Sequence, residues 1–582
     1  MKFLEVASAF ADIERESSRL KMTHLLGELF KKANAEEINL IANLSLGQLQ
    51  APYLGQQFNM AEKNLIKVIA ELLNDSEHTI AQQLKVCGDL GIVAGAGAWS
   101  AEKELSVHDV YAALSDLQKI SGTGSQEEKG SHLLGLLKSL DPLSAKYIVR
   151  VILGKLRLGF SDMTVIDALS WMEAGNKSLR AIIENAYNLS VDIGYISSEL
   201  KSKGIKALED MTIKIGIPIR PAAAERLPTA RAIIEKLGPS VAQPKLDGFR
   251  LQIHVKKNGK GGKPEIHFFS RNLLDMSYMF PDIAAAVAQL DVQELICEGE
   301  AIVYDTHTNT FLPFQETVKR KRKHGIEQAA EEFPLRVFIF DLLYLNGKEY
   351  LNATHEERRT ALLKLFAHFP NPAIQVIGER QVNTGKELEE YFAENIAAGL
   401  EGLVVKRADA IYQPGKRNFN WIKLKRQEEG HLEDTVDCVI LGYYAGEGKR
   451  ATFGIGAFLV GLYNPHQDRF ETVAKIGTGL SDEQWVELKK KCDAIAVQQQ
   501  PKNVLIGNKD LIPHVLVDPS IVCIILADEI TISPAHTAGK TEHKLGYALR
   551  FPRFMGYSID KSAEEATAVH EIERMYQDQF KK

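Results

Sequence analysis

The chain has few of the features that mark secreted, membrane or zinc-binding proteins. It has five cysteines in 582 residues, and no two of them are close enough for a CxxC zinc site. Scattered thiols are typical of a reducing cytosol, so we expect a cytoplasmic protein. The acidic N-terminal segment lacks the apolar core of a signal peptide, and no apolar run reaches ~18 residues. We therefore expect neither secretion nor a membrane span.

The chain also lacks an excess of basic residues, because its formal net charge is -6. Taken alone, this charge argues against a nucleic-acid protein, but such a protein needs a basic surface, not a basic total. Two local clusters are basic: the run 319–323, and a set consisting of Lys146, Arg150, Lys155 and Arg157. Clusters of this kind bind phosphates without reading base sequence. The other interpretation is an ordinary charged face exposed to solvent.

The spacing of hydrophobic residues changes twice along the chain, which predicts three domains. Residues 1–215 repeat apolar side chains at three- and four-residue intervals and predict an all-α domain. Residues 216–431 alternate strand patterns with helical ones and predict an α+β domain. Residues 432–582 contain short strands punctuated by glycine and predict a β-barrel of the OB-fold type. A multidomain chain also fits the usual domain size of roughly 100–200 residues.

Individual segments give sharper expectations within the second and third domains. Residues 294–305 and 335–345 predict strands, while 354–368 and 385–398 predict helices between strands. In the third domain, a single helix fits at 481–498.

The tetrapeptide Lys245-Leu246-Asp247-Gly248 is the central chemical feature. It follows Pro244, and we expect it to open a strand. A lysine attacks phosphorus only as a neutral amine, a form that partial burial and a neighbouring cation such as Arg250 favour. A KxDG sequence by itself is equally well explained by a surface lysine before a turn, so the rest of the chain must decide.

Five further segments follow the tetrapeptide in order: 269–272, Glu298-Gly299-Glu300, Phe340-Asp341, 401–406 and 421–425. They supply cations that can clamp a triphosphate, because phosphoryl transfer depends on positioning and charge neutralisation. These cations are Arg250, Arg271, Arg417, Lys423 and Lys425.

On a strand, Lys423 and Lys425 lie on one face while Ile422 and Leu424 lie on the other. The alternative for this Lys-x-Lys pattern is a solvated strand edge.

Glu300 and Glu401 are candidate ligands for Mg²⁺ or for a ribose. Mg²⁺ prefers oxygen ligands and usually takes one or two carboxylates together with phosphate oxygens. The alternative is a pair of carboxylates facing solvent. Phe340 lies in an apolar segment, so its default interpretation is a core strand residue.

The ordered set of segments resembles the covalent nucleotidyltransferase superfamily, which contains DNA ligases, RNA ligases and capping enzymes. The resemblance implies that Lys245 forms a lysyl-adenylate, that Phe340 stacks on adenine, and that ATP and Mg²⁺ are required. The tail segment 550–554 and Lys561 resemble the C-terminal motif of DNA ligases. That resemblance implies that Arg553 and Lys561 close over ATP and orient the pyrophosphate.

The N-terminal third narrows the family. Residues 154–170 and 186–194 resemble the helical DNA-binding domain of archaeal and eukaryotic replicative ligases, and 216–221 resembles the segment that leads into their catalytic core. The resemblance implies an ATP-dependent DNA ligase that clamps nicked double-stranded DNA as a monomer, close to the nucleoid if the source is prokaryotic. A sliding clamp is a possible further partner, for which 48–58 is a faint candidate motif.

Two alternatives remain at this point. An RNA ligase or capping-type nucleotidyltransferase would share the core motifs, but such enzymes lack the N-terminal domain. A non-catalytic DNA clamp could keep the fold, but the complete set of charged motif residues argues against it. NAD⁺-dependent ligases carry a four-cysteine zinc site, which the cysteine spacing here excludes.

The sequence departs from the family pattern at two positions. The family often has Glu two residues before the nucleophile, where it meets adenine, and this chain has Gln243. The family's Asp-Gly-Glu is replaced by Glu298-Gly299-Glu300. Gln243 is therefore a candidate nucleotide contact whose base preference the resemblance alone does not define.

Overall fold

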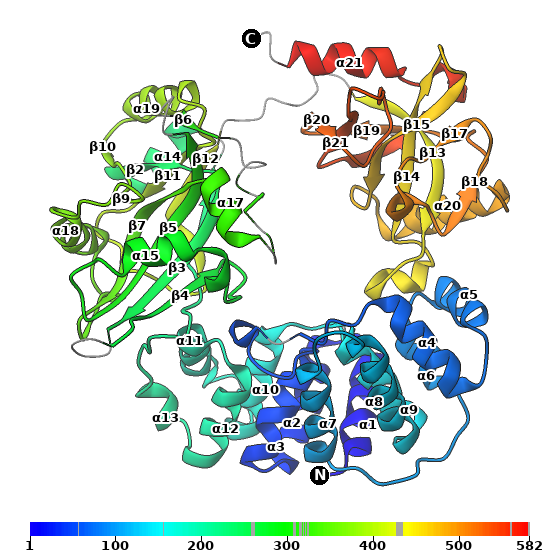
Figure 1. The fold of residues 1–582 in the computed structure, drawn as a ribbon, viewed down its shortest axis with the longest axis horizontal. Coiled ribbons are helices and arrows are strands. Elements are labelled where there is room, and N and C mark those ends of the chain that lie inside the picture. The colour runs from blue at the N-terminus through cyan, green and yellow to red at the C-terminus, as the bar shows by residue number, and fades with distance from the viewer. Residues whose placement is uncertain are drawn as a thin grey trace. The chain divides into compact units, whose positions relative to one another are not determined.

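The computed structural model describes residues 1–55, 57–154, 156–227, 229–257, 262–305, 310–312, 317, 319–320, 322, 325–425, 435–558 and 561–579. The chain divides into two compact units (Figure 1). The first unit comprises 1–59, 105–121 and 154–426, and the second comprises 60–104, 122–153 and 427–582. The predicted all-α segment therefore contributes helices to both units. The predicted domain boundaries at 215/216 and 431/432 stay a prediction.

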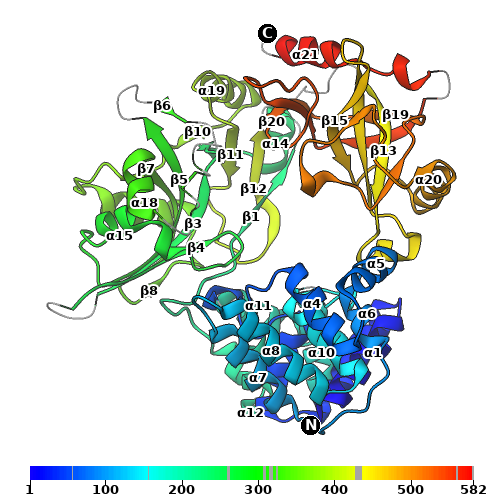
Figure 2. The same ribbon diagram turned by 45° about the vertical axis from the view of Figure 1, so that its right-hand side comes forward.

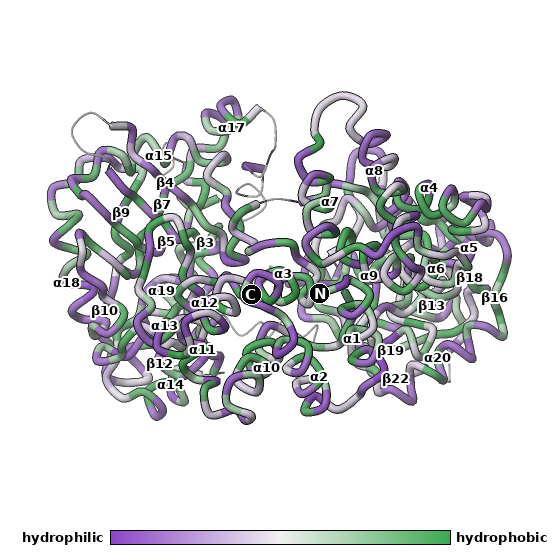
Figure 3. The backbone as a smooth tube through the Cα atoms, turned by 90° about the horizontal axis from the view of Figure 1, so that it is seen from below, coloured by the Kyte–Doolittle hydropathy of each residue, from purple (hydrophilic) through white to green (hydrophobic). Residues whose placement is uncertain are grey.

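The N-terminal segment is helical, as its hydrophobic spacing predicts. Helix α1, for example, buries Phe3, Val6 and Phe10 along one side, and the Asn34 side chain caps α3 by accepting hydrogen bonds from two backbone N–H groups. Hydrophobic and hydrophilic stretches are interleaved along the chain (Figure 3).

The helices of the first unit are α1 (Phe3–Arg15), α2 (Arg19–Lys32), α3 (Ala35–Ser45), α7 (Val107–Lys119), α10 (Asp162–Ala174), α11 (Arg180–Ser190), α12 (Ile193–Lys203) and α13 (Lys206–Glu209). Those of the second are α4 (Glu62–Leu73), α5 (Glu77–Cys87), α6 (Leu90–Gly95), α8 (Ser125–Ser139) and α9 (Pro142–Ile152).

Two sheets form the α+β part of the first unit, and the first of them has five strands. Its order is β1-β12-β11-β2-β10. Helices α14 (Ala230–Leu237) and α19 (Gly385–Ala397) contact this sheet, and Ile422 and Leu424 belong to the hydrophobic core between them. The strands are β1 (Ala223–Arg226), β2 (Ser240–Lys245), β10 (Arg380–Val382), β11 (Gly402–Lys406) and β12 (Arg417–Lys425).

The second sheet has seven strands, with the main order β4-β3-β5-β7-β8, β6 beside β5 and β9 beside β7. Helices α15 (Pro281–Val287) and α18 (His355–Phe366) contact it, and α17 (Ile326–Glu332) contacts α15. The strands are β3 (Phe249–Lys256), β4 (Glu265–Ser270), β5 (Glu294–Asp305), β6 (Thr310–Phe311), β7 (Leu335–Leu345), β8 (Lys348–Glu349) and β9 (Ile374–Val376).

The expectation that Lys245 opens a strand is wrong. Lys245 is the last residue of β2, and the next strand begins at Phe249. Proline is normally excluded from the central strands of a sheet, because it has no N–H to donate. Pro244 is tolerated in β2 because the ladder with β10 covers only Ser240–Ala242, so Pro244 pairs with β11 alone.

The C-terminal part of the second unit is a strongly curled sheet of eight strands, confirming the barrel-like fold class (Figure 2). Its long strand β13 (Val436–Tyr444) pairs with β14 over most of its length and with β18 and β19 over different halves. Helix α20 (Asp482–Ala494) matches the helix expected at 481–498, whereas the helix at the end of the chain, 569–578, was not predicted. The other strands are β14 (Ala457–Asn464), β15 (Arg469–Ile476), β16 (Ala496–Val497), β17 (Val504–Leu505), β18 (Val515–Val517), β19 (Val522–Leu526) and β22 (Arg553–Tyr557). A separate hairpin consists of β20 (Glu529–Ser533) and β21 (Gly546–Arg550), and α21 (Val569–Asp578) follows.

Neither basic cluster forms the uniformly solvated patch that its sequence predicts. Arg320 is 1% exposed and pairs with Asp282 at 2.7 Å. Arg150 is 2% exposed and pairs with Asp89 at 2.8 Å. Both arginines are therefore core residues with local partners, and neither is available to DNA. Lys155, Lys321 and Lys323 of the two clusters lie outside the described residues.

The structure also places two other expected features. Of the clamp-binding candidate 48–58, Phe58 is buried, Leu54 is exposed, and Gln56 lies outside the described residues. Within the described ranges, no helix combines the length and the apolar character that a membrane crossing requires.

Candidate active site

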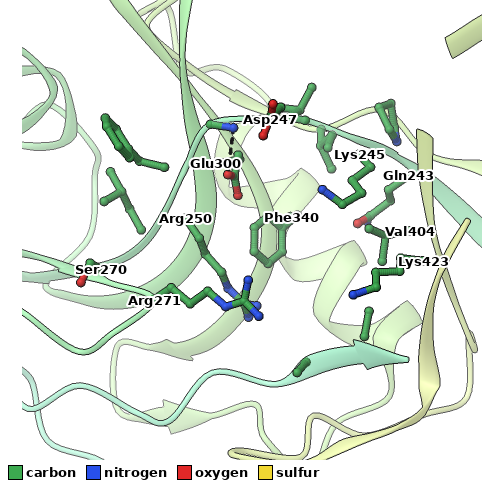
Figure 4. Close-up of a pocket in the computed structure, with 18 of the residues that line it drawn as sticks. Gln243, Lys245, Asp247, Arg250, Ser270, Arg271, Glu300, Phe340, Val404 and Lys423 are labelled. Atoms are coloured by element: carbon green, nitrogen blue, oxygen red, sulfur yellow. Dashed lines mark hydrogen bonds between the residues drawn. The ribbon is translucent and has the colours of Figure 1, made fainter. Parts of the chain in front are cut away.

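A cavity of about 500 Å³ lies between the two sheets of the first unit. Its wall is formed by residues of β2, β3, β5, β7, β11 and β12, together with the loop between β2 and β3 (Figure 4). Among the residues predicted from the sequence, the cavity brings together Gln243, Lys245, Arg250, Arg271, Glu300, Phe340, Lys423 and Lys425. A volume of several hundred Å³ suits a small-molecule ligand.

Lys245 reaches this cavity from the end of β2. Its side chain is 22% exposed and forms an ion pair with Glu401, whose other carboxylate oxygen pairs with Lys425. Burial alone would raise the pKa of Glu401, but Lys245 and Lys425 lower it below its ordinary value. Glu401 is therefore an ionised group that holds both lysines at the cavity.

Glu300 faces the same space from β5. Its carboxylate accepts a hydrogen bond from the Gly248 backbone at 3.2 Å. Burial raises the pKa of Glu300 to about 7, against the opposing charges of Arg250 and Lys245. The close approach also explains Gly248, since a Cβ atom there would lie 2.3 Å from the carbonyl oxygen of Ala301.

Arg250 is held under the cavity by a buried carboxylate. Its guanidinium donates to Glu298 at 2.9 Å and to the Ala222 carbonyl at 2.8 Å. Burial disfavours its charge, yet Glu298 raises the pKa of Arg250 above its ordinary value. Glu298 is 1% exposed and also accepts from the Tyr412 hydroxyl at 2.8 Å. The first residue of Glu298-Gly299-Glu300 thus orients Arg250 and Tyr412 in the interior, while the third faces the cavity.

Phe340 forms part of the cavity wall (Figure 4). Its ring meets Trp421 edge-on, with centroids 6.3 Å apart, and lies against the Arg250 guanidinium at 5.3 Å. Phe340 is partly exposed and also packs against a buried cluster. Phe340 therefore packs in the core and also presents a ring surface to the cavity, so both the core and the stacking interpretations remain compatible with its position.

The remaining predicted cations differ in position. Lys423 lines the cavity, and its pKa is lowered by burial and by neighbouring cations, Lys425 and Arg417 first among them. Arg271 is exposed at the cavity rim. Arg417 is exposed at the far end of β12 and is not among the residues that line the cavity.

The two cations predicted from the tail belong to the second unit. Arg553 pairs with Asp528, and its side chain is 44% exposed. Lys561 pairs with Asp437 at 2.6 Å, and its side chain is 47% exposed. Both cations therefore have local, solvent-accessible partners within their own unit.

The structure adds residues that the sequence did not single out. Lys406 is 1% exposed, lines the cavity and lies 4.2 Å from the Trp421 ring centroid. Burial lowers the pKa of Lys406 to about 8, although Asp341 favours its charged form. Asp341 in turn pairs with Arg358 at 2.6 Å. The only sequence signal for these residues was their position within or near the strand motifs.

Gln243 has a partner that no motif predicted. Its side-chain Nε2 donates to Glu379 at 2.8 Å, and Glu379 also accepts from His355 at 2.8 Å. Glu379 and His355 lie more than a hundred residues after Gln243 in the chain, so only the folded sheet brings them together.

The chain matches three family models in order. The model for the DNA ligase N terminus matches residues 2–170, the model for the ATP dependent DNA ligase domain matches 221–425, and the model for the ATP dependent DNA ligase C terminal region matches 451–561. The alternative of an RNA ligase or capping enzyme is not supported, because the matching models and the named relatives are DNA ligases.

Individual relatives agree with the family models. A probable DNA ligase of Dictyoglomus thermophilum is 43% identical over 583 residues, covering 100% of this chain and 98% of its own. The DNA ligase of Sulfurisphaera tokodaii is 38% identical over 603 residues, with coverage of 100% and 98%. The solved structure Pmar-Lig_PreS3 shares the fold, with a TM-score of 0.55 and 17% identity over 95% of this chain and 99% of its own. The chain therefore belongs to the ATP-dependent DNA ligases, and its relatives include the archaeal enzymes.

Proposed function

We propose that this ligase seals nicks in duplex DNA through a covalent AMP adduct on Lys245. The observation that carries the proposal is the convergence of Lys245, Glu300, Lys423 and Lys425 on one cavity of nucleotide size. In Figure 4, the amino groups of Lys245 and Lys423 point into the same space as the Phe340 ring. Such an arrangement can place a base, a phosphate chain and an amine nucleophile together.

The reaction has three steps. In the first, the neutral Lys245 nitrogen bonds to the α-phosphorus of ATP, the bond to the bridging oxygen breaks, and pyrophosphate leaves with the electron pair. The nitrogen also gives up one proton as the lysyl-adenylate forms. In the second, an oxygen of the 5′-phosphate attacks the adenylate phosphorus, the P–N bond breaks, and Lys245 regains a proton. In the third, the 3′-hydroxyl attacks the activated 5′-phosphorus, loses its proton and displaces AMP.

The cavity residues divide the work of the first step. The ammonium group of Lys245 must lose its proton and leave Glu401 before it can attack. Lys423 and Lys425 neutralise phosphate charge, which is the main demand of phosphoryl transfer. Phe340 offers a ring on which adenine can stack, and Arg271 at the rim is positioned for the phosphates or the ribose.

The carboxylates of the cavity fit Mg²⁺ unequally. Glu300 suits a ligand role, because its carboxylate lines the cavity and Mg²⁺ prefers oxygen donors. Glu401 already accepts from Lys245 and Lys425 through its two oxygens, so a metal bound there would compete with these lysines. Among the described residues, no group of three or more His, Cys, Asp or Glu side chains forms a preassembled metal site. Bound Mg²⁺ would neutralise charge on the phosphates, with those phosphates completing its coordination.

We also propose that the enzyme acts on nicked duplex as a monomer. In this proposal the helical N-terminal segment and the C-terminal sheet contact the duplex. A monomer suffices because all the nucleotide contacts of the first unit come from one chain. Arg553 and Lys561 are assigned to the pyrophosphate of the first step, because the tail resembles the C-terminal motif of DNA ligases. A sliding clamp that binds segment 48–58 would have to contact exposed residues such as Leu54, because Phe58 of that segment is buried.

The decisive test is intact-protein mass spectrometry after incubation with ATP and Mg²⁺. We expect an added AMP mass that peptide mapping locates on Lys245 and that is absent from Lys245→Ala. Lys386→Ala is the matched control, since Lys386 is 85% exposed on α19, and it should form the adduct normally. Lys245→Ala should still seal a nick that already carries 5′-AMP. An AMP adduct that persists in Lys245→Ala would refute the assignment.

A further inference from the structure

A buried amide faces the cavity at the wall formed by β2. Gln243 is 2% exposed, yet it is one of the residues that line the cavity. The ladder between β2 and β10 pairs Ala242 with Arg380, so Glu379, directly before β10, lies opposite Gln243. The hydrogen bond from Gln243 Nε2 to Glu379 at 2.8 Å therefore follows from the register of the sheet.

Glu379 is itself fixed in place. His355 Nε2 donates to its carboxylate at 2.8 Å, and the Arg359 guanidinium lies 3.9 Å away. Arg359 is anchored in turn by donating to the Ile377 carbonyl at 2.6 Å. Burial raises the pKa of Glu379, but the hydrogen bond from His355 and the Arg359 charge lower it below its ordinary value. Glu379 is therefore ionised, and an ionised carboxylate can only accept hydrogen bonds.

This acceptor decides which way the Gln243 amide faces. An amide has a donating NH₂ end and an accepting oxygen, and only the NH₂ end can satisfy Glu379. The oxygen must then point away, and no side chain within the described residues donates to it. In Figure 4, the Gln243 oxygen is turned toward the space between Lys245 and Phe340. The cavity thus contains a fixed, unpaired acceptor beside the aromatic ring.

A fixed acceptor discriminates between purines. Adenine carries an amino group that can donate to it, whereas hypoxanthine and guanine carry a carbonyl at the corresponding position, which would place two acceptors against each other. We propose that Glu379 is a positioning residue that fixes the Gln243 amide so that its oxygen selects an amino-bearing purine triphosphate over a carbonyl-bearing one. The inference rests on the proposed function, because it assumes that the cavity holds the base of the nucleotide that Lys245 attacks.

The test compares ATP with inosine triphosphate (ITP) in single-turnover self-adenylation by the full-length protein, measuring kcat and KM for each nucleotide. Leaving a buried acceptor unpaired costs about 1–3 kcal/mol, so the wild type should prefer ATP by about 5- to 150-fold in kcat/KM. Gln243 and His355 donate to the same oxygen of Glu379, Oε2, so Glu379→Leu removes the acceptor that fixes the Gln243 amide. The amide can then turn its NH₂ end to the base, and the ATP:ITP ratio should fall toward one, mainly through KM.

Glu379→Gln is the conservative variant that tests this geometry. Its oxygen can take the place of Glu379 Oε2 and accept from both Gln243 and His355, so the ATP:ITP ratio should stay closer to the wild-type value than in Glu379→Leu. Gln243→Glu alone places two carboxylates side by side and should weaken both nucleotides. Glu394→Gln is the matched control, because Glu394 pairs with Arg380 at 2.7 Å on the surface, and its ratio should not change.

The ratio is measured within one preparation, so a partly misfolded variant does not alter it. An unchanged ratio in Glu379→Leu, an equal loss of the ratio in Glu379→Gln, or a wild type without ATP preference would each overturn the inference. These outcomes are distinct from failure of the proposed function, which would appear as a missing AMP adduct in the wild type or a persisting one in Lys245→Ala.

Discussion

The cations around the cavity and the cations of the C-terminal tail are held in different ways. Arg358 and Lys406 are each 1% exposed and share the carboxylate of Asp341, which is itself buried. Arg553 and Lys561 are 44% and 47% exposed, and each pairs with one aspartate near solvent. Removing a partner from a buried pair is costly, whereas exposed pairs exchange easily. The buried pairs of Arg358 and Lys406 with Asp341 should therefore be fixed, whereas the exposed pairs of the tail can exchange at low cost.

The largest loss of stability is expected when the carboxylate shared by the buried cations, Asp341, is removed. Asp341→Ala leaves Arg358 and Lys406 buried without their shared carboxylate, and the loss of one partner from a buried pair typically costs about 3–5 kcal/mol. Hydrogen exchange of β7 and β11 amides should report this loss locally, which avoids assuming two-state unfolding of a multidomain chain. Arg380→Ala, at an exposed pair with Glu394, should leave the same amides almost unchanged. Equal protection in both variants would remove the distinction between the two kinds of charge.

The tail cations should show the opposite profile, with normal stability and impaired chemistry. Losing one contact that stabilises transition-state charge costs roughly 2.7–4 kcal/mol, so Arg553→Ala and Lys561→Ala should slow adenylation by about 100- to 1,000-fold. Sealing of a pre-adenylated nick should be nearly normal, because no pyrophosphate leaves in that step. Single-turnover measurements of both steps make the comparison. Equal losses in both would mean that the tail supports folding or DNA binding.

Phe340 tests whether a partly buried cavity residue binds the nucleotide or only supports the core. Stacking of a base on an aromatic ring contributes ~1–3 kcal/mol, so Phe340→Ala should weaken ATP binding by roughly 5- to 150-fold. We expect the KM for ATP to rise more than the maximal rate falls. Phe340→Leu keeps most of the packing and should keep the KM defect. If circular dichroism shows Phe340→Leu unfolded, the ring is a core residue first.

The smallest expected effect is a loss of stability at low pH in the sheet that contains β3. Burial lowers the pKa of His254 to about 3, and its Nδ1 accepts from the Gly216 N–H at 3.1 Å. Unfolding restores the ordinary pKa of about 6.5, so the unfolded chain binds a proton that the folded one does not. Stability should therefore fall as the pH drops below 6.5, by about 1.4 kcal/mol for each pH unit, until the folded pKa is reached. Hydrogen exchange between pH 6.5 and 5 should show a slope shallower by one proton in His254→Gln. An identical slope would mean that His254 is not neutral in the folded protein.

The sequence predicted best those parts in which neighbouring residues decide the outcome. Strands β5 and β7 coincide with the predicted strands 294–305 and 335–345, because the apolar residues within each segment carry a strong local signal. The alternation along β12 also placed Lys423 and Lys425 at the cavity and their apolar neighbours in the core.

Parts of the site depend on contacts that are distant in sequence, and those were not predictable. Nothing around Gln243 indicates that Glu379 lies opposite, because that neighbour is set by the register of β2 with β10. A run of basic residues likewise gives no sign that Arg320 turns inward to Asp282. The end of β2 at Lys245 was missed because Pro244 normally interrupts a strand, and its tolerance depends on where β10 stops.

The sharing of Glu401 by two lysines gives the proposed nucleophile a partner that it must leave before it can react. In the proposed mechanism, an unprotonated Lys245 standing open in the cavity would be reactive toward any electrophile small enough to enter. In the structure its amine is held by Glu401 instead. A triphosphate brings enough negative charge to compete with Glu401 for the lysines, so the arriving substrate itself supplies the means of releasing the nucleophile. One carboxylate, Glu401, thus both holds the Lys245 amine and can give it up when ATP binds.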